Sequence, residues 1–308
     1  MSSKGIRRKS DGFGWKMHLC VISAAILFVI TAPAQTPASV MEESAMAEKV
    51  QLFAFNGGYI KLPKNLLFKD SNEGELISIP IPFFVIKHGN SLVAIDTGMN
   101  RKVASDHVSH WGEVISRMLT PTLKIEDTFE EQIKSKLGAK PQDFSAVILT
   151  HGHLDHAGGL DAFKDTNVPI YVQKPEYEVL RQVVELGVSG YIPGDLKHID
   201  RLNFKPIEGL LDLFNDGTVV VFPMPGHTSG MQSVLVKTDK RTFVVPSDAC
   251  DTLEHLEKVL QPARSTDLAQ SVQGLYILQL LRSMGAEIIP MHDLAYWGKK
   301  PLAPHAFE

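Results

Sequence analysis

Short apolar runs recur along the chain and are rich in Ile, Val and Phe, a composition that favours β-strands. Two of them, 77–86 and 91–96, are joined by His88-Gly89-Asn90, which is typical of a turn. Further strands are expected at 146–149, 218–222, 233–236, 242–245 and 286–290. From Gln51 onward, the pattern predicts a domain built on short strands.

Three helices interrupt these strands. Apolar residues at intervals of four predict a helix over 128–137, where Thr128 and Glu131 have the spacing of a capping box. Two more are expected over 175–186 and 267–284, each followed closely by glycine. The order of elements predicts an α/β or α+β domain whose sheets are covered by helices. Periodicity alone does not decide between one sheet and two.

The first 34 residues follow a different pattern. A basic segment, 4–16, precedes an uncharged apolar run at 19–30 and then Ala32-Pro33-Ala34. This order is typical of a secretory signal peptide. A membrane anchor is the alternative, but a spanning helix needs about 20 apolar residues and this run is shorter. We predict that residues 1–34 are cleaved, that the protein is periplasmic or secreted, and that it meets a membrane only through export.

The remaining chain is expected to be a linker or N-terminal arm over 35–50 and one globular domain over 51–308. Removing residues 1–34 lowers Lys+Arg from 31 to 26 and Asp+Glu from 35 to 34, so the formal charge changes from −4 to −8. Such an acidic protein is poorly suited to phosphate backbones, so no nucleic-acid partner is expected. Cys20 falls in the predicted signal, and the other cysteine, Cys250, is expected to be a small buried residue.

A dense group of metal-ligating residue types directly follows the strand at 146–149, in His151-Gly152-His153-Leu154-Asp155-His156. A turn at Gly152 would let two imidazoles converge on one ion and leave Asp155 and His156 for a second. Burying these groups without a cation would be costly, and nitrogen and carboxylate ligands suit zinc. The alternative is a solvated loop that happens to be rich in histidine.

Three more potential ligands, His227, Asp248 and His292, also lie just past predicted strands. One rim of the sheets could therefore collect them all. The other histidines lack this setting and are expected to be surface or packing residues: His88, His107, His110, His198, His255 and His305.

The run from His151 to Gly159 resembles the signature of the metallo-β-lactamase superfamily. Other motifs of that superfamily are matched in the same order by Asp96-Thr97-Gly98, Gly226-His227-Thr228, Ser247-Asp248 and His292. The similarity spans about residues 52–300. Segments 80–86, 168–177 and 225–233 resemble the N-acyl homoserine lactonase branch.

This resemblance implies a four-layer αβ/βα sandwich with two zinc ions, or other divalent transition metals, at one edge. The implied ligands are His151, His153 and His227 for one ion, Asp155, His156 and His292 for the other, and Asp248 for both. Asp96 would orient a ligand histidine.

The activity implied is opening of the lactone ring of N-acyl homoserine lactones or related lactones, which degrades quorum signals. A hydroxide bridging the metals would attack, and Asp155 would be the catalytic proton acceptor and donor. The alternatives are an ester, thioester or β-lactam hydrolase of the same fold, or a non-enzymatic periplasmic protein that binds zinc or a ligand. The partner is a small-molecule lactone or ester, and a homodimer is left open.

One position departs from the lactonase pattern. Lactonases usually carry a tyrosine three residues after the bridging aspartate, and this chain has Asp251 there. Tyr191 and Tyr296 are candidate replacement donors, although ordinary packing is the simpler interpretation. Trp111, Ile115, Met118 and Leu119 could line an acyl groove or form a core-facing helix stripe.

Overall fold

The fold is described from a computed structural model, which places residues 48–307. The predicted signal peptide and most of the predicted arm lie outside the described residues, so both stay predictions. Within 48–307, no helix combines the length and the apolar character that a membrane crossing requires.

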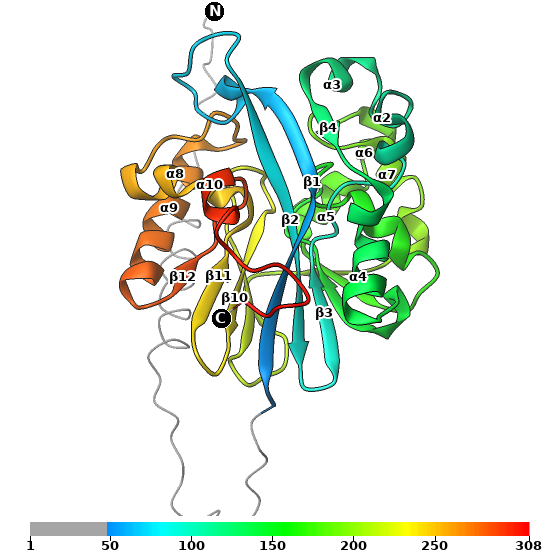
Figure 1. Cartoon of the computed structure of the whole chain (residues 1–308), viewed down its shortest axis with the longest axis vertical. Helices are drawn as coiled ribbons and strands as arrows, with labels where there is room; N and C mark the ends of the chain where they lie inside the picture. The colour runs from blue at the N-terminus through cyan, green and yellow to red at the C-terminus, as the bar shows by residue number, and fades with distance from the viewer. Residues whose placement is uncertain (1–47, 308) are drawn as a thin grey trace, which may run out of the picture. The chain divides into compact units, whose positions relative to one another are not determined.

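Two β-sheets form the centre of the domain (Figure 1). The larger has the strand order β4-β1-β2-β3-β5-β6-β7 and the smaller β12-β11-β10-β9-β8. The larger sheet consists of β1 Val50–Pro63, β2 Leu76–His88, β3 Ser91–Ile95, β4 Thr120–Thr122, β5 Phe144–Ile148, β6 Pro169–Gln173 and β7 Asn203–Ile207. The smaller consists of β8 Leu211–Asp212, β9 Val219–Pro223, β10 Gln232–Lys237, β11 Thr242–Val245 and β12 Glu287–Ile288.

All seven strands expected from the apolar runs are present, with ends that differ by a few residues. The expectation of short strands is wrong for β1, which has 14 residues and pairs with β2 along its length, with an irregularity between Asn56 and Tyr59. Strands β3, β5, β6 and β7 pair in parallel, so their carboxyl ends share one edge of the sheet.

Helices cover the outer face of each sheet (Figure 1). On the side of the larger sheet lie α2 Val103–Trp111, α3 Glu113–Met118, α4 Phe129–Leu137, α5 Lys174–Leu180, α6 Val183–Leu186 and α7 Pro193–Leu196. Beyond the smaller sheet lie α8 Leu253–Lys258 and α9 Leu268–Ser283, and α10 Leu294–Trp297 follows β12. This arrangement confirms the αβ/βα sandwich.

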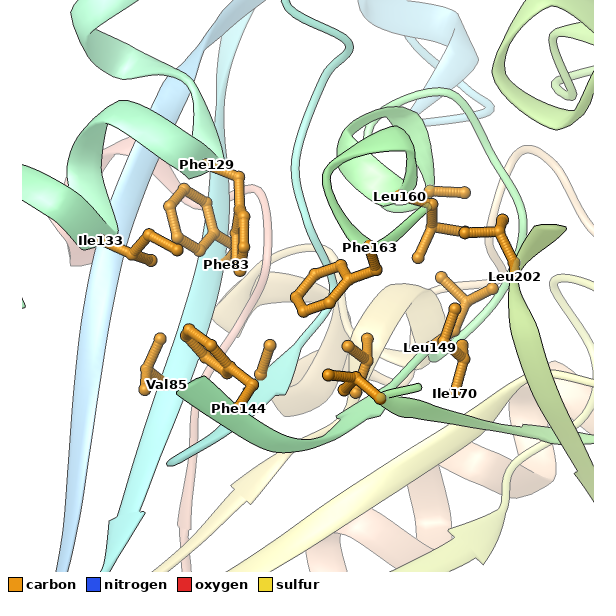
Figure 2. Close-up of a cluster of buried hydrophobic side chains, with 14 of the residues drawn as sticks. Phe83, Val85, Phe129, Ile133, Phe144, Leu149, Leu160, Phe163, Ile170 and Leu202 are labelled. Atoms are coloured by element: carbon orange, nitrogen blue, oxygen red, sulfur yellow. The ribbon is translucent and has the colours of Figure 1, made fainter. Parts of the chain in front are cut away.

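The core has two principal layers. Between the sheets, alternate residues such as Ile148 of β5 and Val234 of β10 are fully buried. On the other face of the larger sheet, Phe129 and Ile133 of α4 pack with Phe144 of β5 (Figure 2). The strands that carry the polar residues of the site are thus buried on both faces, which fixes where each strand ends.

Two local details of the helices differ from expectation. The capping box of α4 is absent, because the Thr128 hydroxyl donates to the carbonyl of Ile125 at 2.7 Å instead of capping the helix. The helix expected over 175–186 is divided into α5 and α6 between Leu180 and Val183. The helix at 267–284 is confirmed as α9, whose N-cap Asp267 accepts from the amide of Gln270.

Candidate active site

The polar residues that follow the strands meet at one edge of the two sheets. The 151–156 loop follows β5, Asp96 follows β3, and His227, Asp248 and His292 follow β9, β11 and β12. Gly152 is required in the loop, because a Cβ there would lie 2.3 Å from Leu180 Cδ2 and 2.6 Å from Tyr191 Cε1.

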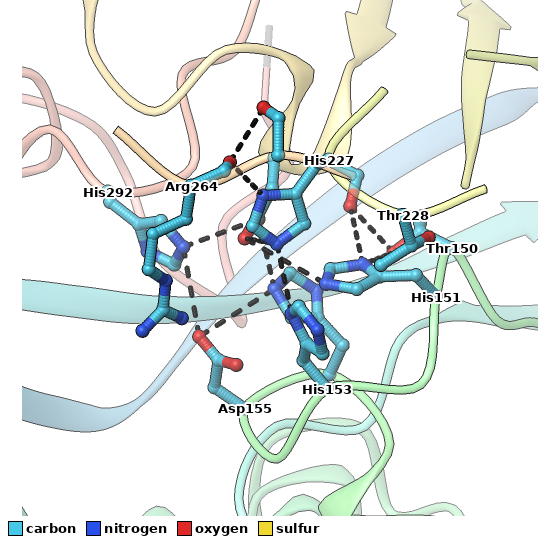
Figure 3. A network of polar contacts seen from close by, with 12 residues as sticks. Thr150, His151, His153, Asp155, His227, Thr228, Arg264 and His292 are labelled. Carbon is cyan, nitrogen blue, oxygen red and sulfur yellow. Dashed lines mark hydrogen bonds and ion pairs between the residues drawn. The ribbon is translucent and has the colours of Figure 1, made fainter. Parts of the chain in front are cut away.

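The structure brings together all seven sequence-predicted ligands, here called the ligand cluster: His151, His153, Asp155, His156, His227, Asp248 and His292. Figure 3 labels His151, His153, Asp155, His227 and His292 of this cluster. They form two groups. His151, His153, His227 and Asp248 offer one set of ligand atoms within 4.8 Å of one another, and Asp155, His156 and His292 offer another.

Asp248 joins the two groups because each of its carboxylate oxygens faces one of them. Oδ2 lies 3.3 Å from His227 Nε2 and 3.8 Å from His151 Nε2. Oδ1 lies 3.0 Å from His156 Nε2 and 3.3 Å from His292 Nε2. A carboxylate in this position can bridge two cations.

The outer nitrogens of four cluster histidines are held by hydrogen bonds. Nδ1 of His227 donates to the carbonyl of Arg264 at 3.2 Å, and Nδ1 of His292 donates to that of Pro80 at 3.0 Å. Because a carbonyl oxygen only accepts, these Nδ1 atoms carry the proton, and in the neutral ring the Nε2 lone pair faces the cluster.

For the other two, Nδ1 of His156 is 2.8 Å from Asp96 Oδ2, and Nδ1 of His151 is 3.2 Å from Ser247 Oγ. The Ser247 hydroxyl donates to Thr150 Oγ1, which donates to Asp96. Asp96 therefore supports two ligand histidines, one directly and one through this chain.

Two of these supporting residues have strained backbone conformations. Asp96 has φ 58° and Ser247 has φ 54°, in the left-handed region that residues with a Cβ seldom occupy. Such conformations cost of order 1–3 kcal/mol and persist where the surrounding structure imposes them. Here the strain aims two side chains at the outer nitrogens of ligand histidines.

The charges of the cluster are unequally distributed. Burial lowers the pKa of His151 and His153 well below the usual value of histidine. Burial also opposes protonation of His156, but the carboxylates of Asp248, Asp155 and Asp96 raise its pKa well above the usual value. The imidazoles of His151 and His153 are thus neutral, whereas His156 attracts positive charge.

The cluster fits metal ions. His151 Nε2, His156 Nε2 and Asp248 Oδ1 are buried and have no hydrogen-bond partner among residues 48–307. Buried polar atoms without partners are costly, and two cations, one in each group of ligands, would satisfy all three. Imidazoles with lone pairs facing inward and outer nitrogens held by neighbours match the donor set and support that zinc requires.

A cavity of about 590 Å³ opens beside the cluster and reaches His153, Asp155, His227, Asp248 and His292. Its other walls are mainly apolar. They come from β1, the segment between β1 and β2, β2 itself, α3 and the 187–193 loop, and they include Ile60, Leu62, Leu67, Ile79, Ile115 and Val188.

The four residues expected as either a groove or a helix stripe, Trp111, Ile115, Met118 and Leu119, all line this cavity. They do not form a stripe on one helix, because Gly112, with φ 82°, separates α2 from α3.

The other predicted residues are placed as follows. Tyr191 lines the cavity with its ring against His153, but its hydroxyl donates to Glu176 at 2.6 Å. Tyr296 is outside the cavity lining and donates to Glu287. Neither tyrosine therefore replaces the hydroxyl donor that lactonases usually carry at the position of Asp251. Asp251 lines the cavity, and Cys250 is buried with its thiol donating to the carbonyl of Thr252.

The remaining histidines lie outside the groups of potential metal ligands found within 48–307. Three of them have specific partners. His88 contacts Glu48 and Asp216, His110 contacts Asp195, and His255 Nε2 donates to the carbonyl of Leu67.

Glu176 supports the site in a way that the sequence did not reveal. Its buried carboxylate accepts from the Gly152 amide, the Tyr191 hydroxyl and the Thr228 hydroxyl, at 2.9, 2.6 and 2.7 Å. These donors come from three separate segments, so no local spacing signals the contact.

The sequence pattern also gives no indication of a role for Arg264. Its side chain lines the cavity on the same side of the cluster as Asp155 and His292 (Figure 3), and it makes no hydrogen bond or ion pair within the described part of the chain. It lies in a loop without a recognisable motif.

Comparison with known proteins gives the class that this fold and cluster define. Residues 80–249 match the metallo-beta-lactamase superfamily, and the chain belongs to that superfamily and, within it, to the N-acyl homoserine lactonase family. It is an enzyme of the metal-dependent hydrolase type.

Among its relatives is the N-acyl homoserine lactonase AttM of Azorhizobium caulinodans, 30% identical over 84% of this chain and 99% of that protein. Two solved structures are each 25% identical, cover 85% of this chain and 100% of their own, and have a TM-score of 0.75. One is a mutant of AiiA from B. thuringiensis with N-decanoyl-L-homoserine bound at the active site. The other is an N-acyl homoserine lactone hydrolase with the product N-hexanoyl-L-homoserine at the catalytic metal center.

Proposed function

We propose that this protein opens the lactone ring of N-acyl homoserine lactones or closely related lactones and uses two zinc ions to do so. One observation carries the proposal: two groups of buried ligands share Asp248 and open onto a largely apolar cavity of about 590 Å³. A polar reacting centre at one end of an apolar cavity matches an acylated lactone.

The metals are assigned to the two groups described above. His151, His153 and His227 would hold one ion, Asp155, His156 and His292 the other, and Asp248 both. When bound, such a pair lowers the pKa of a shared water to about 7, which provides a hydroxide nucleophile, and polarises the carbonyl.

Asp155 is assigned the proton transfer. Its Oδ2 lies 3.7 Å from the Nε2 atoms of both His156 and His292, and the residue lines the cavity. Oδ1 is thereby left to accept a proton from the attacking water and to deliver it to the ring oxygen as the ester bond breaks. The product is an N-acyl homoserine with one free carboxylate and one hydroxyl.

The cavity walls are assigned to the acyl chain. Trp111 and Leu119 are buried, while Met118, which also lines the cavity, is 46% exposed. Such a gradient lets the first methylene groups become fully buried and leaves the end of a long chain partly in water. Arg264, whose guanidinium has no partner among the described residues, is placed to donate to an oxygen of the substrate.

The N-terminal assignments complete the proposal. Residues 1–34 would direct export and be removed, 35–50 would be an arm, and 51–308 the hydrolase domain acting in the periplasm or outside the cell. A homodimer stays a prediction.

The test is a panel of N-acyl homoserine lactones, simple esters, thioesters and β-lactams, assayed on metal-loaded protein. We expect the highest kcat/KM for acyl homoserine lactones, loss of turnover on chelation, and recovery on adding zinc. A higher kcat/KM for another class would replace the substrate assignment. Failure with every class in protein that binds two metals would favour a binding protein.

A further inference from the structure

Asp251 is a carboxylate without a partner at the edge of the ligand cluster. It is 9% exposed, lines the cavity, and makes no hydrogen bond or ion pair within residues 48–307. A buried carboxylate needs a compensating donor or cation. In the lactonases that this chain resembles, the same position usually carries a tyrosine, which is neutral and needs a hydrogen-bond partner but no cation.

The position of Asp251 is set by the backbone. The amide of His292 donates to the carbonyl of Asp251 at 2.8 Å, and the amide of Met291 donates to that of Cys250 at 3.0 Å. Two neighbouring bonds therefore tie the segment after the bridging Asp248 to the segment that carries His292. This pairing brings the Asp251 side chain to one specific half of the cluster.

The ligand atoms confirm which half this is. One carboxylate oxygen of Asp251 and the ligand atoms of Asp248 and His292 all lie within 4.8 Å of one another. Asp248 faces His292 through Oδ1, the oxygen that also faces His156. Asp251 is thus grouped with Asp248 and with His292, a member of the second set of ligands, and not with the three histidines of the first set.

We propose that Asp251 is an additional ligand of the ion held by Asp155, His156 and His292, which makes the two halves of the metal centre chemically different. This inference rests on the metal centre proposed above. With Asp251, the second half has two imidazoles and three carboxylates, including the shared Asp248, whereas the first has three imidazoles and only Asp248. Carboxylate oxygens suit Mn²⁺ better than imidazoles do, so the second half accepts Mn²⁺ while the first retains Zn²⁺.

The experiment compares metal binding in the wild type and in Asp251→Asn, which keeps the side-chain shape but removes the charge. Protein with one equivalent of Zn²⁺ is titrated with Mn²⁺, and the Co²⁺-loaded protein is examined by visible absorption. We expect Asp251→Asn to weaken Mn²⁺ binding at least about 10-fold, the loss typical even for a residue behind the ligands. Its Co²⁺ bands should intensify, since fewer ligands give stronger d–d absorption.

Arg264→Gln is the matched control, because it changes the charge of the same cavity by one unit without touching a ligand atom. A purely electrostatic effect predicts opposite shifts in Mn²⁺ affinity for the two variants and unchanged Co²⁺ bands in both. Coordination predicts altered bands in Asp251→Asn alone. If Asp251→Asn does not fold, judged by circular dichroism, Asp251→Ser is used in its place.

The outcomes separate this inference from the proposed function. Wild-type protein that binds no metal contradicts both. A different result overturns only the role of Asp251. In that result the wild type binds two metals, and the Asp251 variant has the same Mn²⁺ affinity and Co²⁺ spectrum as the wild type. In that case the carboxylate faces the substrate, and the lactone panel should show a changed KM in the variant.

Discussion

The ligand cluster and the opposite cavity wall face the same space but are built in different ways. The cluster follows strands buried on both faces, and its supports, Asp96 and Ser247, are held in strained backbone conformations. The wall around α3 follows a break at Gly112, and its Val114 and Met118 are 74% and 46% exposed.

This difference indicates that the cluster and the wall have separate roles, one in the reaction and the other in substrate preference. Residues behind the metals are constrained by several hydrogen bonds each, so small changes there should affect the reaction itself. The exposed residues of the wall, such as Met118, meet solvent on one side and make no hydrogen bonds to the cluster, so changes there should affect which acyl chain is preferred. Substitutions in the cluster, in its supports and in the wall test this contrast.

Removing a bridging or terminal ligand should have the largest effect. In His153→Ala or Asp248→Ala, loss of metal should reduce kcat/KM by about 1,000-fold or more, since a catalytic metal contributes several kcal/mol to the transition state. Steady-state kinetics and metal analysis on each purified variant check this. A variant that combines His153→Ala with Asp248→Ala and still hydrolyses the substrate at the wild-type rate would rule out the cluster as the reaction centre.

Asp96→Asn should have the next largest effect. The amide keeps the size of the carboxylate but loses the charge that orients His156 and receives the Thr150 hydroxyl. Replacing a partner of this kind typically costs 10–100-fold in metal affinity or activity. Metal titration and kinetics measure it, and a Met118→Ala variant that lost more activity on every substrate would reverse the proposed contrast.

Gly190→Ala tests contact between the wall and the cluster. A Cβ at Gly190 would lie 2.6 Å from His153 Nε2, whereas at Gly187 nothing lies within 4 Å. Both residues have positive φ, so Gly187→Ala controls for backbone strain. We expect about a 10-fold loss of kcat in Gly190→Ala and only a lower Tm in Gly187→Ala. Equal kinetic losses in the two variants would mean that strain alone is responsible.

Met118→Ala should have the smallest and most selective effect. Shortening this side chain removes apolar contact worth about 1 kcal/mol, which is about fivefold in kcat/KM for a decanoyl substrate. A butanoyl substrate should lose little. Leu280→Ala, on the exposed face of α9 outside the cavity lining, is the control. An identical loss for both chain lengths would mean that Met118 does not contact the acyl chain.

The sequence predicted the cluster well because its residues follow strands. Apolar runs locate strands, and His227, Asp248 and His292 each come just past the end of one, so they could be associated with the 151–156 loop as residues of one rim, and the family resemblance implied the same set. The number of sheets could not be predicted, since strand pairing depends on contacts between distant residues.

The errors arose where tertiary contacts override local patterns. Thr128 has the spacing of a cap, but its hydroxyl donates backward to Ile125. For Tyr191, ordinary packing was the simpler of the two interpretations, and its hydroxyl donates to Glu176. Arg264 could not be found because its loop has no periodicity and its place depends on a bond from its carbonyl to His227.

The three hydrogen bonds to Glu176 have a thermodynamic consequence. They connect the 151–156 loop, which carries four residues of the ligand cluster, with the turn after His227 and with Tyr191, whose ring forms part of the cavity wall. An acyl chain that packs against the Tyr191 ring therefore contacts a residue bonded to Glu176, whose carboxylate also holds the loops that carry the ligand cluster. By thermodynamic linkage, if acyl binding strengthens metal binding by a given free energy, bound metals strengthen acyl binding by the same free energy.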